Sequence, residues 1–218
     1  MAKDISEQLV RIRVDSVTLQ GVLAIPAGAP GVVLFAHGSG SSRHSPRNNY
    51  VAAVLRKAGI GTLLFDLLTE EEDVVYETRF DIHLLTDRLT AATKWLTTQS
   101  NAKKLKIGYF GASTGAAAAL EAAAVLGTTV RAVVSRGGRP DLAGPVLGRV
   151  KAPTLLIVGG HDDVVIELNR QAYDRLKAEK ELVIVPGATH LFEEPGTLEE
   201  VARLAAEWFT RHLGSKSA

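Results

Sequence analysis

Short, unbroken apolar runs restrict the fold of this 218-residue chain more than any other feature. Residues 32–35 (Val-Val-Leu-Phe) and 155–158 (Leu-Leu-Ile-Val) contain no polar side chain, which is typical of strands buried on both faces. Amphipathic helical patterns lie between such runs; in residues 82–96, apolar side chains recur at spacings of three and four. The alternation predicts a single α/β domain over residues 1–218, with a mostly parallel central sheet covered by helices.

Eight short β-rich runs are the expected strands. They are residues 9–14, 18–25, 31–36, 61–65, 106–110, 130–135, 154–158 and 181–185. Only Asp15 and Ser16 lie near the junction of the first two runs, so these two runs are expected to form an antiparallel hairpin at the sheet edge.

Composition excludes several classes of function. The chain has no cysteine, which excludes disulfides, thiolate metal sites and a cysteine nucleophile. Its 25 Lys and Arg nearly balance its 24 Asp and Glu, so the overall charge does not favour nucleic-acid binding. No run approaches the roughly 18 apolar residues of a membrane span, and the polar N-terminus lacks a signal-peptide pattern. A cytoplasmic protein without membrane contact is expected.

The segment with the most chemical information is Gly111-Ala112-Ser113-Thr114-Gly115. This G-x-S-x-G pattern lies between an expected buried strand and an expected helix, the context of a nucleophile elbow. Two glycines permit a tight turn that holds Ser113 out at the carboxyl end of the sheet. The Thr114 amide at the helix N-terminus is then suited to stabilising an oxyanion.

A serine nucleophile needs a base and a carboxylate that orients the base. His190 follows the last expected strand, and loops at the carboxyl ends of strands carry active sites in such sheets. The preceding strand leads into Asp162 and Asp163, of which only one can face the histidine. We favour Asp162, with Asp163 as a helix or turn cap.

The second oxyanion donor is expected in the loop after the third strand. Gly38 lets that backbone bend toward the serine, and the amide of Ser39 is the expected donor. His37 is interpreted as a structural hydrogen-bonding residue.

The motifs His37-Gly38, 111–115, 159–162 and 187–190 follow one another over nearly the whole chain. In this order they resemble an α/β-hydrolase, most closely the small dienelactone-hydrolase-like branch. The resemblance implies the α/β-hydrolase fold, with an eight-stranded, mostly parallel sheet, and a Ser-His-Asp hydrolase. Dienelactone hydrolases proper use a cysteine where this chain has Ser113, which favours cleavage of carboxylic esters through an acyl-serine intermediate.

The connection between Ser135 and Thr154 is too short for a helical lid, so an open pocket for small ester substrates is expected. Arg43, His44, Arg136 and Arg139 lie on loops at the catalytic edge and are candidates for holding an anionic substrate group. The acidic residues 70–73 are interpreted as a solvated loop.

Several alternatives remain open at this stage. An acyltransferase or a perhydrolase would use the same triad, and a non-catalytic ligand-binding protein could retain the fold. A dinucleotide-binding domain fits the Gly38-x-Gly40 segment but leaves the later serine, aspartate and histidine unexplained. No cofactor and no metal site are expected, since His161 beside two aspartates is too compact a ligand set. A monomer or a homodimer is expected.

Overall fold

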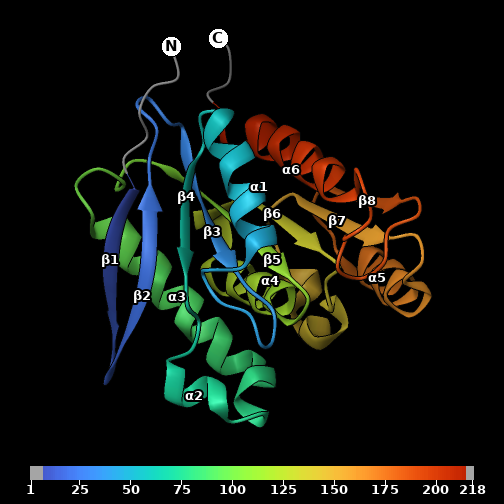
Figure 1. Cartoon of the computed structure of the whole chain (residues 1–218), viewed down its shortest axis with the longest axis horizontal. Coiled ribbons are helices and arrows are strands. Elements are labelled where there is room, and N and C mark those ends of the chain that lie inside the picture. The colour runs from blue at the N-terminus through green and yellow to red at the C-terminus, as the bar shows by residue number, and fades with distance from the viewer. Residues whose placement is uncertain (1–6, 215–218) are drawn as a thin grey trace.

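The computed structural model describes residues 7–214 and places eight strands in one open, mostly parallel sheet (Figure 1). The strands are β1 (Glu7–Val14), β2 (Val17–Ala24), β3 (Gly31–Ala36), β4 (Gly61–Phe65), β5 (Lys106–Ala112), β6 (Val130–Arg136), β7 (Thr154–Gly159) and β8 (Lys180–Val185). Their order across the sheet is β1-β2-β4-β3-β5-β6-β7-β8. All eight expected strands are present.

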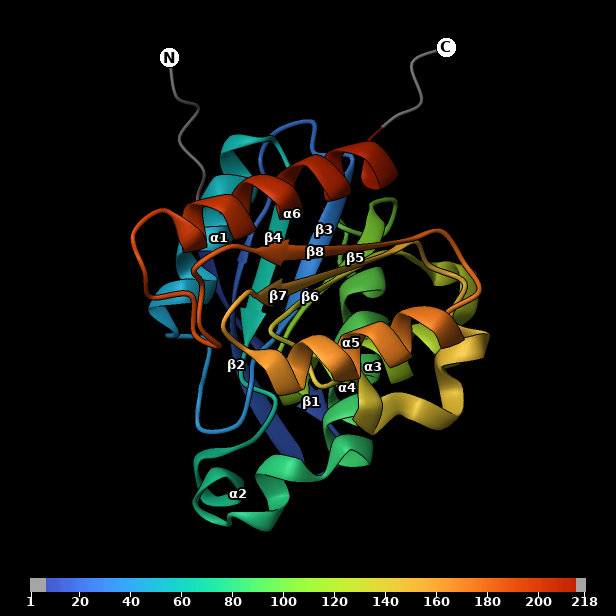
Figure 2. The same cartoon turned by 90° about the vertical axis from the view of Figure 1, so that its right-hand side faces the viewer.

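Helices cover both faces of this sheet (Figure 2). The α-helices are α1 (Pro46–Lys57), α2 (Glu70–Val74), α3 (Ile82–Thr98), α4 (Thr114–Leu126), α5 (Asp163–Arg175) and α6 (Thr197–Leu213), and the 3-10 segments are η1 (Glu77–Phe80), η2 (Gly127–Thr129) and η3 (Pro140–Arg149). One face carries α1 and α6, and the other carries α3, α4 and α5.

Burial explains why the apolar runs form the centre of the sheet. Every residue of β3, β4 and β7 is buried, which fits strands covered on both faces. Helix α4 is buried over its first ten residues, and its alanines allow it to pack closely against the sheet and against α3. The parallel strands β3 to β8 therefore all end at one edge, and the loops after them meet there.

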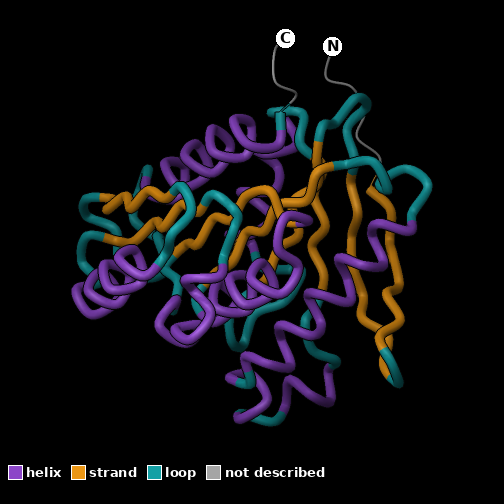
Figure 3. Tube along the Cα trace, turned by 180° about the vertical axis from the view of Figure 1, so that it is seen from behind, coloured by secondary structure: helices purple, strands orange, loops and turns teal. Residues whose placement is uncertain are grey.

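The first two strands form the expected antiparallel hairpin, with β1 at the sheet edge (Figure 3). Strand β2 pairs antiparallel with β4 from Gly21↔Phe65 to Ala24↔Thr62. Residues 17–20 of β2 thus extend past the carboxyl end of β4, and the hairpin tip lies at the edge where the parallel strands end.

Within residues 7–214, the connection between β6 and β7 forms no cap over this edge. Its ten-residue segment η3 packs against α4 and α5. Among the described helices, none combines the length and the apolar character needed to cross a bilayer.

The acidic residues 70–73 belong to a helix, which corrects the interpretation of this segment as a loop. Thr69 caps α2 by a capping box: its hydroxyl accepts from the Glu72 amide, and the Glu72 carboxylate accepts from the Thr69 amide. Carboxylates in the first turn also interact favourably with the helix dipole. Helix α2 projects from the body of the protein beside the edge where the parallel strands end (Figure 2).

Candidate active site

The turn between β5 and α4 has the geometry of a nucleophile elbow. Ser113 has a φ of +51°, a left-handed conformation that is uncommon for a residue with a side chain. A Cβ at Gly111 would overlap Ala116, and a Cβ at Gly115 would overlap the carbonyl oxygen of Ala36. The two glycines are therefore required by close backbone approach, and they leave Ser113 half-exposed at the sheet edge.

The structure brings Asp162, and not Asp163, to His190. The Nδ1 atom of His190 lies 2.7 Å from Oδ2 of Asp162, whose side chain is 16% exposed. Asp162 occupies the N-cap position of α5, yet its carboxylate makes no capping hydrogen bond. Asp163 is the first residue of α5, where a carboxylate favours the helix dipole.

The loop that carries His190 is held by its neighbours. Both the amide and the hydroxyl of Thr189 donate to the carboxylate of Glu194, at 3.0 and 2.6 Å. These hydrogen bonds lower the pKa of Glu194. Phe192 has a φ of +56° and its ring is buried, which fixes the loop against the α1–α6 side of the sheet.

The end of β6 and the residue after it lie between Ser113 and His190. The Ser113 amide donates to the Arg136 carbonyl at 3.3 Å, and a Cβ at Gly137 would lie 3.6 Å from Cε1 of the His190 ring. In the described part of the chain, the Ser113 hydroxyl has no hydrogen-bond partner. Hydrogen bonds between a nucleophile and its base commonly tighten only when substrate binds.

The two expected oxyanion donors also lie close together. A Cβ at Gly38 would lie 3.1 Å from the Ser113 Cβ, so the loop after β3 touches the elbow. The Ser39 amide donates to Oγ1 of Thr114 at 3.0 Å, and the Thr114 side chain is almost completely buried. This hydrogen bond connects the oxyanion loop to the residue that follows the nucleophile.

The His37 side chain helps to hold the loop after β3 in place. Its Nε2 accepts a hydrogen bond from the Leu67 amide at 2.9 Å, which requires a neutral ring. Burial lowers the pKa of His37 and so favours the neutral form. The ring therefore ties the loop after β3 to the end of β4.

The basic residues at the edge have different surroundings. Arg43 forms an ion pair with Asp66, and its amide also donates to Asp66 at 2.8 Å. Arg139 makes a bidentate pair with Asp141 at 2.9 and 2.8 Å. His44 is exposed, and its backbone amide donates a hydrogen bond to the Ser42 hydroxyl. Arg43 and Arg139 are thus already engaged by carboxylates.

Arg136 is buried and has no such partner within residues 7–214. Its Nη2 atom donates to Oδ1 of Asn48 at 3.3 Å, its Nε atom has no hydrogen-bond partner, and its guanidinium lies 5.9 Å from the centre of the Phe192 ring. Desolvation, with a smaller contribution from nearby Arg47, lowers the pKa of Arg136 to about 10. The Arg136 side chain lies against Phe192 of the His190 loop. A contact between Arg136 and an anionic substrate group stays a prediction.

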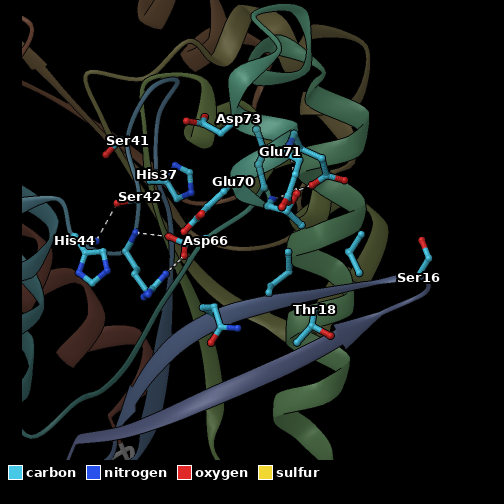
Figure 4. Close-up of a pocket in the computed structure, with 17 residues that line it drawn as sticks. Ser16, Thr18, His37, Ser41, Ser42, His44, Asp66, Glu70, Glu71 and Asp73 are labelled. Atoms are coloured by element: carbon cyan, nitrogen blue, oxygen red, sulfur yellow. Dashed lines mark hydrogen bonds and ion pairs between the residues drawn. The ribbon is translucent and has the colours of Figure 1, made fainter.

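A cavity of about 840 Å³ opens beside the loop after β3 (Figure 4), and Ser113 is not among its lining residues. It is lined by residues 16–20 of the hairpin, His37, residues 41–44, Asp66 and residues 68–73. The sequence interpretation missed this wall, although two signals were present. Thr69 and Glu72 have capping-box spacing, and Thr18 and Gln20 are alternate polar residues on an edge hairpin.

Within residues 7–214, no three histidine or acidic side chains gather in a way that could hold a metal ion.

Comparisons with known proteins identify the family and the fold of the chain. Residues 19–213 match the family model described as the dienelactone hydrolase family. A dienelactone hydrolase structure from Anabaena variabilis is 59% identical, with a TM-score of 0.94 over 95% of this chain and 98% of the other. Est1E from Butyrivibrio proteoclasticus has a TM-score of 0.82 at 16% identity over 95% and 99% of the two chains, which shows the shared fold.

Two relatives from Mycobacterium tuberculosis strains are each 59% identical over 207 residues and carry the name "Putative phosphoribosyl transferase". The match covers 95% of this chain but only 47% of each relative. This chain therefore spans about half the length of the curated relatives that it matches.

Proposed function

The chain belongs to the dienelactone hydrolase family, and on that premise we propose that it is a serine hydrolase that cleaves small carboxylic esters. The observation that carries this proposal is the left-handed conformation of Ser113 between two glycines that close packing requires. Across the residues that follow β6, His190 is paired with Asp162. Strained residues of this kind are kept where the surrounding structure fixes them for function.

In the proposed mechanism, Oγ of Ser113 attacks the ester carbonyl carbon while His190 takes the serine proton. Asp162 orients the ring through Nδ1 and stabilises its protonated form. The carbonyl oxygen gains negative charge and is stabilised by the Thr114 amide and by the Ser39 amide, which exchanges its acceptor, Thr114 Oγ1, for the oxyanion. The C–O bond then breaks, His190 protonates the departing alcohol, and an acyl-Ser113 intermediate remains.

Water completes the reaction by the same steps. His190 takes a proton from the attacking water, and the second tetrahedral intermediate expels Ser113, which recovers its proton from His190. An alcohol, an amine or peroxide in place of this water would make the product of an acyltransferase or a perhydrolase. Added alcohol tests that alternative, because it would divert the acyl group into a new ester.

The described chain favours small acyl groups. The connection from β6 to β7 packs against α4 and α5 and supplies no apolar wall above Ser113. Each buried methylene contributes only about 0.8 kcal/mol, so a long acyl chain gains little at an open edge.

A series of p-nitrophenyl esters from acetate to palmitate tests the proposal. We expect the highest kcat/KM between acetate and hexanoate and a loss of at least about a thousandfold in Ser113→Ala. Ser113→Ala with unchanged far-ultraviolet circular dichroism and full activity would overturn the serine mechanism. A maximum at palmitate would overturn the assignment of small substrates.

A further inference from the structure

The cavity beside the oxyanion loop has the size of a ligand site. Its volume of about 840 Å³ falls within the usual range of small-molecule pockets, about 300–1,000 Å³. His37 lines it, and the next residue, Gly38, contacts Ser113. The cavity wall at His37 is therefore adjacent in sequence to Gly38, the residue that contacts Ser113.

Polar, uncharged groups make up much of the wall. Thr18 and Gln20 contribute from β2, Ser41 and Ser42 from the oxyanion loop, and Thr69 from the start of α2. Figure 4 shows Thr18 and Ser16 on the hairpin, Glu70 and Glu71 on the opposite side, and Asp66 between them. Hydroxyl and amide groups both donate and accept hydrogen bonds, so this wall can satisfy a ligand that does both.

The charges of the wall are mostly compensated. Three of its five carboxylates have arginine partners, in the pairs Asp66–Arg43, Glu72–Arg88 and Asp73–Arg79. The other two, Glu70 and Glu71, are exposed, where solvent and salt weaken their attraction for a cation. The single arginine inside the cavity, Arg43, is neutralised by Asp66 and is not free to hold an anion.

From this lining we propose that the cavity binds a polyhydroxylated, uncharged part of the substrate, such as a sugar ring or a cyclic polyol. The inference rests on the proposed ester hydrolysis. A ring of hydroxyls exchanges hydrogen bonds with the wall without the cost of desolvating a charge, whereas an apolar ring would bury the wall groups without partners. The polyol belongs either to the alcohol or to the acid of the ester.

Matched ester pairs test the inference on the whole chain. Methyl 6-O-acetylglucoside is compared with cyclohexylmethyl acetate for the alcohol side, and methyl quinate with methyl cyclohexanecarboxylate for the acid side. We expect kcat/KM to be at least about tenfold higher for the polyol ester in one of the pairs, since a few net hydrogen bonds supply that factor. Acetylcholine, which is also an acetate ester, tests whether the cavity prefers a cationic alcohol group.

Variants of the cavity wall test whether the preference for polyol esters arises in the cavity. Gln20→Leu and Thr18→Val remove hydrogen-bonding groups at nearly constant volume, and each should reduce the polyol preference about three- to tenfold. Gln8→Leu, the same change on strand β1 away from the cavity, should leave the preference intact. The melting temperature of each variant shows whether it folds. The comparison of the matched esters on the wild-type protein does not depend on any variant.

The inference is overturned if neither polyol ester exceeds its apolar partner, if acetylcholine exceeds the best polyol ester, or if the preference survives both cavity variants. Absence of hydrolysis for every ester, with Ser113 unreactive toward a fluorophosphonate, would instead overturn the proposed function and the inference with it. Hydrolysis of neutral p-nitrophenyl acetate without a polyol preference overturns the inference alone.

Discussion

The catalytic edge has two parts that are built in different ways. The elbow and the His190–Asp162 pair lie on the turn and the loops that follow β5, β7 and β8, and close backbone contacts at Gly111 and Gly115 fix the strained Ser113. The cavity wall lies on the exposed hairpin tip and on α2, held by a capping box and by ion pairs at the surface. The residues proposed for bond breaking are thus fixed by close backbone contacts, and the residues proposed for substrate choice lie on exposed segments, which tolerate change.

The largest expected effect distinguishes the two aspartates beside the base. Asp162→Asn should lower kcat by about three to four orders of magnitude, because the amide no longer orients and stabilises the protonated His190 ring. Asp163→Asn is the matched control, and we expect its kcat to stay within about threefold of wild type, since that carboxylate only favours the dipole of α5. Initial rates on p-nitrophenyl acetate decide between them. Equal losses would show that the observed pairing does not define the acid.

The second effect tests how strongly the core fixes the elbow. A Cβ at Gly115 would overlap the Ala36 carbonyl oxygen, so Gly115→Ala should lower the free energy of unfolding by about 3 kcal/mol or more and reduce activity sharply. At Gly148 the nearest atom is 3.8 Å from an added Cβ, and Gly148→Ala should be nearly neutral. Urea unfolding of the two variants measures the difference. Similar stabilities would contradict the tight packing of the elbow.

A smaller effect is expected at the junction between the elbow and the oxyanion loop. Thr114→Val keeps the side-chain shape but removes the acceptor of the Ser39 amide, so the loop loses its connection to the elbow. We expect kcat to fall about tenfold with little change in KM, and Thr114→Ser to restore the rate. Steady-state kinetics at constant melting temperature provide the measurement. Wild-type kcat in Thr114→Val would show that this hydrogen bond does not position the donor.

The smallest effect contrasts the two arginines at the edge. Arg43→Met removes the partner of Asp66 and should cost about 1–2 kcal/mol of stability. Arg136→Met removes a buried charge that has no carboxylate partner within residues 7–214, and should be neutral or stabilising by about 1 kcal/mol. Denaturant titration of both variants tests the contrast. A large loss in Arg136→Met would mean that its contacts with Asn48 and Phe192 outweigh the cost of burying the charge.

Local patterns were sufficient to predict the core of the molecule. Unbroken apolar runs located β3 and β7, and the hairpin of β1 and β2 followed from the short connection between two runs. The elbow was predictable for the same reason: G-x-S-x-G has its effect within five residues, where strand, turn and helix are contiguous in sequence.

Features that depend on distant residues were not predictable in the same way. The sequence places Arg43 and Arg136 on loops at one edge, but Arg136 is the last residue of β6, and only the fold brings Asp66 to Arg43 and sets the Arg136 guanidinium over the Phe192 ring. The cavity requires the antiparallel pairing of β2 with β4, which carries the hairpin tip past the sheet edge. The alternate polar residues Thr18 and Gln20 indicate an exposed strand face, but they do not indicate which strand β2 pairs with.

Covalent labelling tests most directly whether Ser113 is the nucleophile. The wild-type protein is treated with a fluorophosphonate, digested and examined by mass spectrometry, with Ser113→Ala and His190→Ala in parallel. We predict one adduct on the peptide that contains Ser113, none in Ser113→Ala, and much slower labelling in His190→Ala, since the serine is activated by its base. An active wild-type enzyme that remains unlabelled, or that carries its adduct on another residue, would contradict the assignment.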